Sequence, residues 1–535
     1  MLRPGGDPLP AGLIEGLWAL KLLVVLHIGV AWLVARRLPG WSSRPRQGAG
    51  RREGFAIAGL LLVGLLLRLP GLDAGLWYDE IQTLVDYIRQ PWGVLLTTFD
   101  STNQHLLFSI AARASRAVFG LGAASLRLPA VLFGVASLWA TLAFARRWLP
   151  AREAWWSAVI LAVSYHHIWF SQNARGYTGL LLGTLLGSLP FLDLLRQRPP
   201  TRMAVWAYAW IMALSLLTHV TALVVLAAHG LVWLWQVRRL EAGRARWVPF
   251  IGLVLAGSVT VMLYAPVLPQ MLTAVSTSGT SAPGIAWQRP GWFIAEAIAG
   301  LVRGIPAGIV LVPLAGLVVL TGLADAWRRD RVVVALMILP MATMAALVLA
   351  MGHNLWPRFF FFGAGFVVMW AVHGGFVVLD RVVPRLAAPV GHGGLGVVLL
   401  GSLVLLPRAW APKQDYPAAA AWLAAHAAPG DAIVGTEMMD LPMNTWLGHA
   451  WPIVTDSTAL RRIDSVAPRT WVLYTFPIRV QATAPGLWAR LEEAYEVAEV
   501  IPATVGGGEI VIARQRDDGG PAQRTRASAS PAPNQ

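Results

Sequence analysis

Two adjacent carboxylates, Asp79 and Glu80, come shortly after a long apolar stretch of the sequence. That stretch, "GFAIAGLLLVGLLLRLPGL" (residues 54–72), is long and apolar enough to lie in a bilayer, where a charged side chain is costly. Trp77 and Tyr78, which precede the acids, are typical of a membrane–water interface. The acid pair is therefore expected at the rim of a membrane, either in a functional site or as an anchor and cap for the next helix.

A histidine follows in the same loop, which makes the acid pair chemically more interesting. His105 lies in "STNQHLLFS". Two acids and an imidazole can hold a substrate hydroxyl, or they can bind a divalent metal with Glu80 and His105 as ligands. A lone histidine more often has a structural role, and that alternative stays open.

Two later turns carry arginines beside apolar helices. "YHHIWFSQNARGYTGLLL" contains Arg175 and Tyr177, and "MGHNLWPRFFFFG" contains Arg358. A guanidinium at the membrane surface suits a lipid phosphate, since it offers five donors on a permanent charge. The alternative is that each arginine only extends its head group out of the lipid. His219 and His229 lie within apolar segments, and we expect them to make packing hydrogen bonds.

The composition requires lipid as the solvent for most of the chain. Of its 535 residues, 56% are hydrophobic and only 13% are charged. The net charge of +15 comes from arginines in short loops between apolar segments, which is how membrane orientation is encoded and is no sign of nucleic-acid binding. The absence of cysteine excludes disulfides, thiolate metal sites and thiol nucleophiles.

Apolar runs near the ~20-residue length needed to cross a bilayer recur along the chain. The basic loops fall on alternate connections, so they lie in the cytoplasm, and both termini face outward. The first run is interpreted as a retained anchor. We predict about twelve spans, at residues 12–35, 54–70, 127–145, 154–170, 177–195, 203–218, 220–236, 248–267, 305–325, 332–351, 359–379 and 391–407.

The sequence changes character after the last apolar run. Helix-like segments alternate with short apolar strands, expected at residues 432–437, 452–457, 470–476 and 509–515, which predicts a small outer α/β domain. Residues 484–500 are expected to form a helix. No glycine fingerprint for a nucleotide is present. The predicted organisation is an anchor and basic cytoplasmic loop (1–53), a membrane domain with a large first outer loop at 71–127 (54–407), the α/β domain (408–515) and a disordered tail (516–535).

Taken in order, these segments resemble the polytopic GT-C glycosyltransferases, in particular bacterial relatives of the protein O-mannosyltransferases and of the lipid A aminoarabinose transferase. The resemblance rests on "LWYDEIQTL", "TNQHLLFSI", "SLRLPAVLFGVASL", "YHHIWFSQNARGYTGLLL", "LLTHVTALVVL" and "RFFFF", and it covers residues 55–380. It implies a GT-C membrane fold in the bacterial inner membrane. It also implies transfer of a hexosyl or pentosyl group from a polyprenyl-phosphate carrier to an acceptor protein, lipid or glycan outside the cytoplasm.

The resemblance also implies roles for individual residues. Asp79 matches the family's catalytic acid, which acts as base on the acceptor hydroxyl. Glu80 matches its neighbour and is expected to be catalytic as well. His105, Arg175 and Tyr177 match residues that bind substrate, and Arg358 matches the arginine near the lipid phosphate.

Two departures from the family pattern weaken the expectation of a metal. Leu106 and Leu107 replace prolines after the histidine, and Asn173 replaces a glutamate that would have helped to bind a metal or the acceptor. No cofactor is predicted with certainty. Two other functions stay open: a lipid-linked sugar transporter or flippase, and a non-catalytic partner in envelope polysaccharide assembly. Few polar residues lie in the middle of the apolar runs, which argues against a transporter.

Overall fold

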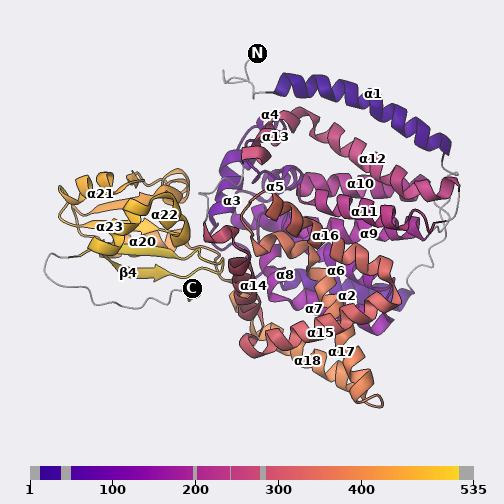
Figure 1. Ribbon diagram of the computed structural model, residues 1–535. Helices are drawn as coiled ribbons and strands as arrows, with labels where there is room; N and C mark the ends of the chain where they lie inside the picture. Colours follow the sequence, from indigo (N-terminus) through magenta and orange to yellow (C-terminus); the bar gives the residue numbers. More distant parts are fainter. Residues whose placement is uncertain are drawn as a thin grey trace. The chain divides into compact units, whose positions relative to one another are not determined.

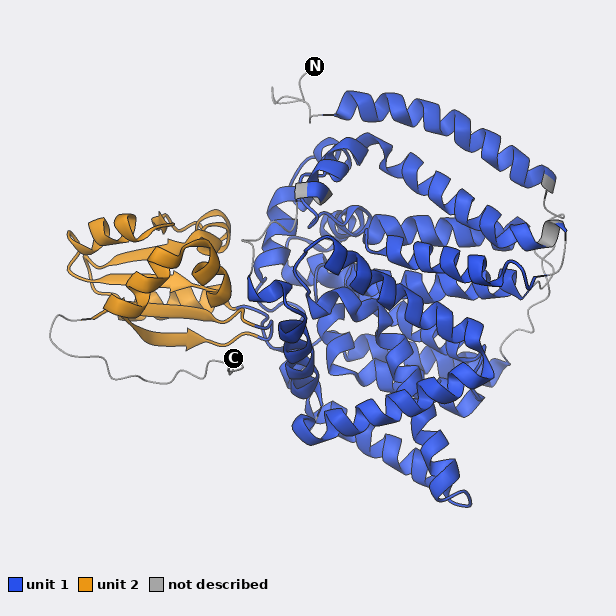
Figure 2. Ribbon diagram, viewed as in Figure 1, with its two compact units in different colours: residues 1–414, 504–506 blue, residues 415–503, 507–535 orange. Residues whose placement is uncertain are grey.

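The protein is described from a computed structural model, which covers residues 12–37, 50–196, 202–240, 243–277, 285–305 and 307–516. Most of the predicted basic loop after the first span and nearly all of the predicted tail lie outside these residues. The chain forms two compact units (Figure 2): unit 1 comprises residues 1–414 and 504–506, and unit 2 the residues between and after them.

Unit 1 is built almost entirely of helices (Figure 1). The long apolar ones are α1 (Leu13–Arg37), α2 (Arg51–Leu66), α6 (Ala123–Ala145), α7 (Ala151–Val163), α9 (Tyr177–Leu195), α10 (Arg202–Thr218), α11 (Ala222–Gln236), α12 (Val248–Tyr264), α15 (Gly308–Arg329), α16 (Arg331–Ala350), α17 (Ala364–Val382) and α18 (Ala387–Val404). The others connect them: α3 (Tyr78–Gln82), η1 (Thr83–Ile88), α4 (Trp92–Thr97), α5 (Leu106–Phe119), α8 (Tyr165–Ser171), η2 (Arg244–Trp247), η3 (Ala265–Val267), α13 (Leu268–Thr277), η4 (Ala286–Gln288), α14 (Pro290–Gly304), η5 (Pro357–Gly363) and α19 (Leu406–Trp410).

These helices make the chain a multi-pass membrane protein. Among the described residues, eight helices are long and apolar enough to cross a membrane, and α10 and α11 are shorter apolar helices. Each predicted span coincides with helical structure, but residues 154–170 are divided. The chain turns at Ser164, whose hydroxyl accepts a hydrogen bond from the His167 N–H and so caps α8. The prediction of one continuous helix there was wrong, because the cap begins a new helix.

Unit 2 contains a five-stranded sheet with the order β2–β1–β3–β5–β4. β1 is parallel to β2 and β3, and β5 is antiparallel to β3 and β4. Side chains such as Val434 and Val472 form its buried core. Its elements are α20 (Tyr416–His426), β1 (Ala432–Thr436), η6 (Glu437–Met439), η7 (Asp440–Trp446), β2 (Ile453–Val454), α21 (Ser457–Asp464), β3 (Thr470–Tyr474), α22 (Pro477–Thr483), α23 (Pro485–Ala494), β4 (Tyr495–Ile501) and β5 (Ile510–Gln515).

The predicted small α/β domain is therefore present, with one error. The helix expected over residues 484–500 ends at Ala494, and Tyr495–Ile501 is strand β4. β4 pairs with β5, from Tyr495 opposite Gln515 to Ile501 opposite Ile510. No glycine or proline separates the helix from the strand in the sequence, so the change depends on pairing with a distant segment.

Candidate active site

The structure brings Asp79 together with the two predicted arginines. Asp79 lies in the short helix α3, Arg175 in the turn between α8 and α9, and Arg358 in η5, where α17 begins. Oδ2 of Asp79 is 3.0 Å from Nη1 of Arg175 and 3.5 Å from Nη1 of Arg358. The Asp79 side chain is 18% exposed and that of Arg175 only 7%. One carboxylate is thus shared by two guanidinium groups.

His105 completes this group, and Asp79, Arg175, Arg358 and His105 are called the Asp79 cluster below. Nε2 of His105 accepts a hydrogen bond from Nε of Arg175 at 2.9 Å. Asn103 accepts another from Nη1 of Arg175 and donates to the Asp79 carbonyl at 3.3 Å. Burial, together with the charges of Arg175, His219 and Arg358, keeps the pKa of His105 well below its ordinary value. The imidazole is therefore neutral, with its proton on Nδ1.

The Asp79 cluster contains two buried donors without a protein partner. Among the described residues, neither Nδ1 of His105 nor Nε of Arg358 has a hydrogen-bond partner. A buried donor without a partner costs free energy, and native proteins keep few of them. Both donors are therefore available to a ligand.

Tyr177 and His219 form an aromatic wall beside His105. The ring centroids of His105 and His219 are 4.4 Å apart, and those of Tyr177 and His219 are 5.2 Å apart. A Cβ atom at position 176 would collide with the carbonyl oxygen of Thr218, so only glycine lets this turn approach His219 so closely. His219 was expected to make packing hydrogen bonds within a helix, but it lies in this wall, just beyond the end of the apolar helix α10.

His229, in contrast, has the packing role that was expected. It lies in α11, where Nδ1 is 3.0 Å from the Tyr208 hydroxyl and Nε2 is 3.2 Å from Ser188 Oγ. Its ring stacks on Phe191 with centroids 4.5 Å apart. These contacts connect α9, α10 and α11.

Glu80 lies apart from the Asp79 cluster although it is the next residue. Its buried carboxylate binds Arg127, with Oε2 2.6 Å from Nη2 and Oε1 2.9 Å from Nε. Oε1 also accepts a hydrogen bond from the Ala174 N–H at 2.7 Å. Burial alone would raise the pKa of Glu80, but Arg127, Lys413 and the Ala174 N–H lower it below its ordinary value. The carboxylate is fully used within the protein.

Lys413 supports the same turn from another side. Its Nζ donates to the Gln172 carbonyl at 2.7 Å and lies 4.9 Å from the centre of the Trp169 ring. Burial and the charge of Arg127 lower the pKa of Lys413 to about 7, although Glu80 acts in the opposite direction. Glu80, Arg127 and Lys413 are called the Glu80 cluster below. The cluster binds the backbone of residues 172–174, directly before Arg175.

Aromatic side chains contact Arg358 and also Asn173, the residue found where the resemblance predicts a glutamate. The Arg358 guanidinium lies 4.8 Å from the Trp356 ring centre and 5.9 Å from that of Trp77. Trp77 Nε1 donates at 3.2 Å to Oδ1 of Asn173. The amide oxygen that replaces the family's carboxylate therefore accepts a hydrogen bond from an indole.

The residues at the site do not fit a divalent metal. Among the described residues, no group of three or more histidines, cysteines, aspartates or glutamates could hold one. The two ligands that the sequence suggested, Glu80 and His105, bind Arg127 and Arg175 instead. A cation would have to displace a guanidinium from each, so we derive no step through a metal.

No protein-family model matches this sequence, and comparison with curated proteins finds no match. Solved structures do match. The apo oligosaccharyltransferase of Archaeoglobus fulgidus is 9% identical, with 84% of this chain and 73% of that one covered and a TM-score of 0.51. ArnT from Cupriavidus metallidurans, bound to undecaprenyl phosphate, is 16% identical, with coverage of 86% and 98% and a TM-score of 0.47. AglB from A. fulgidus, with an inhibitory peptide and a dolichol-phosphate, is 10% identical, with coverage of 86% and 74% and a TM-score of 0.47.

The similarity to the apo archaeal oligosaccharyltransferase shows the fold. It extends over most of both chains, although few residues are identical. The chain has a GT-C fold, a polytopic helical membrane domain with a small additional α/β unit, and the predicted fold class is confirmed.

Proposed function

We propose that this protein is an integral membrane glycosyltransferase that moves a sugar from a polyprenyl-phosphate carrier to an acceptor hydroxyl. The observation that carries the proposal is the Asp79 cluster, in which one carboxylate is shared by Arg175 and Arg358 near the ends of membrane helices. A base and two fixed cations are what such a transfer requires. One protein that shares its fold, at a TM-score of 0.51, is an oligosaccharyltransferase.

The ion pairs of Asp79 suggest how donor binding prepares the base. A phosphate group that binds both Arg175 and Arg358 competes with Asp79 for the same guanidinium groups. Nε of Arg358, which has no partner among the described residues, is a further donor to the phosphate. Once the arginines turn to the phosphate, the Asp79 carboxylate is free to accept a hydrogen bond from the acceptor.

The transfer itself is a displacement at the anomeric carbon. The acceptor oxygen forms a bond to that carbon and gives its proton to Asp79. The bond between the anomeric carbon and the phosphate oxygen breaks, and its electron pair leaves with the polyprenyl phosphate. Arg175 and Arg358 stabilise this negative charge. The neutral His105 and Tyr177 line the sugar side, and the energy of the donor bond makes ATP unnecessary.

We place the reaction at the outer face of the bacterial inner membrane. The arginine-rich loops on alternate connections support this orientation, with the opposite ends of the helices in the cytoplasm. The donor's lipid chain would lie along the apolar helices that begin beside Arg175 and Arg358. The transferred group is proposed to be a hexose or pentose, and the acceptor a protein, lipid or glycan.

Sugar transfer in membranes tests the proposal. Membranes that contain the protein are supplied with a panel of polyprenyl-phosphate sugars and extracts of envelope acceptors, and Asp79→Asn and Arg358→Ala are compared with wild type. Asp73→Asn and Arg303→Ala are matched controls, because both residues lie outside the Asp79 cluster. We expect the first pair to abolish transfer and the control pair to retain it. Transfer that survives Asp79→Asn would contradict the catalytic assignment.

A transporter is distinguished by the fate of the lipid-linked sugar. If the sugar reaches the other leaflet still attached to its carrier, and no acceptor is modified, the protein is a flippase. If neither event occurs while the protein binds an envelope complex, the non-catalytic alternative is favoured. Either result would overturn the proposal.

A further inference from the structure

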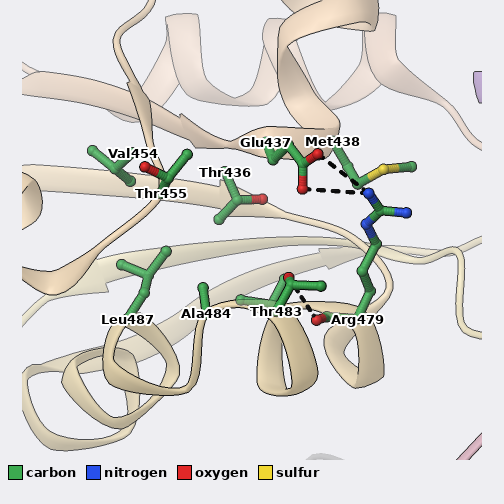
Figure 3. Close-up of a pocket in the computed structure, with 10 residues that line it drawn as sticks. Thr436, Glu437, Met438, Val454, Thr455, Arg479, Thr483, Ala484 and Leu487 are labelled. Atoms are coloured by element: carbon green, nitrogen blue, oxygen red, sulfur yellow. Dashed lines mark hydrogen bonds and ion pairs between the residues drawn. The ribbon is translucent and has the colours of Figure 1, made fainter. Parts of the chain in front are cut away.

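Unit 2 has a pocket of its own at one edge of its sheet. Figure 3 shows side chains that line it, at the carboxyl ends of β1 and β2 and on the facing helices α22 and α23. The chain passes from β1 to β2 on one side and then to β3 on the other. The order therefore reverses beside β1, whose carboxyl end lines the pocket. In open α/β sheets, ligands bind outside the carboxyl ends of the strands near such a point.

A buried hydroxyl without a hydrogen-bond partner gives this pocket a group that a ligand can bind. Thr436, the last residue of β1, is only 3% exposed, and among the described residues its Oγ1 has no hydrogen-bond partner. In Figure 3 its side chain lies in the middle of the pocket, between η6 and the two helices. Leaving a buried hydroxyl unpaired is unfavourable, and native proteins keep few such groups. A ligand hydroxyl that entered here would satisfy it.

A charged pair stands at the mouth of the pocket. Nη2 of Arg479 is 3.2 and 3.4 Å from the two carboxylate oxygens of Glu437. Nε of Arg479 is buried and has no partner among the described residues. The pair presents donors and acceptors side by side with no net charge, so an anion is not favoured here.

Threonines and apolar groups form the remaining wall. Thr455 adds a hydroxyl that can donate and accept hydrogen bonds. The Thr483 hydroxyl donates to the Arg479 carbonyl at 2.9 Å and can still accept one. Val454 and Leu487 supply an apolar surface. The volume is about 80 Å³, well below the roughly 300–1,000 Å³ of pockets that hold drug-sized ligands.

From this chemistry we infer that unit 2 binds a single neutral sugar residue in this pocket. A sugar presents neighbouring hydroxyls to groups that donate and accept, and its C–H groups to an apolar wall. The small volume suits one residue, with any further chain outside. The inference does not depend on the proposed transferase activity, because none of the residues that line this pocket belongs to the Asp79 cluster.

Binding to the full-length protein tests the inference directly. The protein is placed in nanodiscs, because detergents with sugar head groups would compete. Saturation-transfer difference NMR is recorded with methyl glycosides of hexoses and pentoses. Binding of inorganic phosphate, which has no C–H protons, is followed by the line width of its phosphorus NMR signal. Thr436→Val and Arg479→Gln alter the pocket. Thr470→Val and Arg514→Gln are matched controls: Thr470 is buried in neighbouring β3, and Arg514 pairs with Glu496 on another part of the sheet.

We expect at least one glycoside to bind at about 10 mM or below, and each pocket substitution to weaken binding about tenfold. The two control substitutions should leave binding unchanged. Thr436→Val keeps the shape of the side chain and removes only an unpaired hydroxyl, so the protein should fold normally. The inference is overturned if no glycoside binds, if binding is indifferent to both pocket variants, or if phosphate binds there instead.

Discussion

Asp79 and Glu80 are neighbours in the sequence, yet the structure gives them opposite surroundings. Both carboxylates bind arginine. Glu80 is fully buried, and Arg127 and the Ala174 N–H occupy its oxygens. Asp79 is partly exposed, and Nε of Arg358, one of its two arginine partners, has no hydrogen-bond partner among the described residues.

This contrast indicates which of the two carboxylates is able to accept a proton from a substrate. A carboxylate whose oxygens are all used by the protein cannot accept a proton from a substrate without breaking the fold. A carboxylate paired with cations that a phosphate can take over is released by the ligand itself. The Glu80 cluster therefore holds the turn before Arg175, and the Asp79 cluster is the group that we propose meets the substrate.

The largest expected effect is on activity, and it concerns Asp79. Asp79→Asn keeps the shape of the side chain but removes the proposed base, so transfer should fall by about 10²–10⁴-fold. The thermal unfolding temperature should fall less than in Glu80→Gln, because the Asp79 carboxylate is partly exposed whereas that of Glu80 is fully buried. Initial rates with a lipid-linked donor and thermal scans of the same preparations measure both. If Asp79→Asn lowers the unfolding temperature as much as Glu80→Gln does, the proposed difference between the two acids is contradicted.

Glu80→Gln should show the reverse pattern, with its main effect on stability. The substitution leaves Arg127 buried without a counter-charge, which costs roughly 3–5 kcal/mol when a buried pair is broken. The yield of folded protein and its unfolding temperature should fall. Glu80→Gln combined with Arg127→Met removes both charges. It should recover only part of the loss, because Arg127 also donates to the carbonyls of Leu72, Ala74 and Gly75. An unchanged unfolding temperature in the single variant would contradict the structural role.

The sequence predicted the membrane architecture well because lipid leaves the chain few choices. Each predicted span coincides with helical structure, since an apolar segment in a bilayer must satisfy its backbone internally. It also identified Asp79, Arg175 and Arg358 as residues of interest from their positions beside apolar helices. What it could not give was their partners, which depend on how distant turns pack.

Three misses show this dependence on tertiary contacts. No role was predicted for Arg127, although it binds Glu80 across 47 positions of sequence. His219 was assigned to packing, because nothing in its own segment indicates His105 as a neighbour. Strand β4 was read as helix, because its local sequence continues a helical pattern and only pairing with β5 makes it a strand.

A smaller effect is expected at His105, where the comparison is between two substitutions. His105→Ala removes the acceptor for Nε of Arg175 and should raise the KM for the donor about tenfold, as expected for a lost hydrogen bond to a charged group. His105→Gln can place an amide oxygen near the same position and should restore part of the affinity. Steady-state kinetics with varied donor concentration separate KM from kcat. Equal values for both variants would argue that the imidazole has another role.

The smallest effect is a change in pH dependence, and it belongs to the Glu80 cluster. The pKa of Lys413 is lowered to about 7 in the folded protein, against roughly 10.4 when unfolded. Between these pH values the unfolded chain binds more protons than the folded one. The free energy of unfolding should therefore rise with pH by up to about 1.4 kcal/mol per pH unit, and this contribution is lost as the pH is lowered to 7.

Lys413→Met should remove this contribution, and the chain offers a close control. Lys21 is the only other lysine in the sequence, so Lys21→Met changes the same chemical group in α1. Unfolding temperatures measured between pH 7 and pH 9 should rise more for wild type and Lys21→Met than for Lys413→Met. If the unfolding temperatures of all three proteins rise equally with pH, the pKa of Lys413 is not lowered in the folded protein. The turn before Arg175 would then be held by Glu80 without a contribution from Lys413.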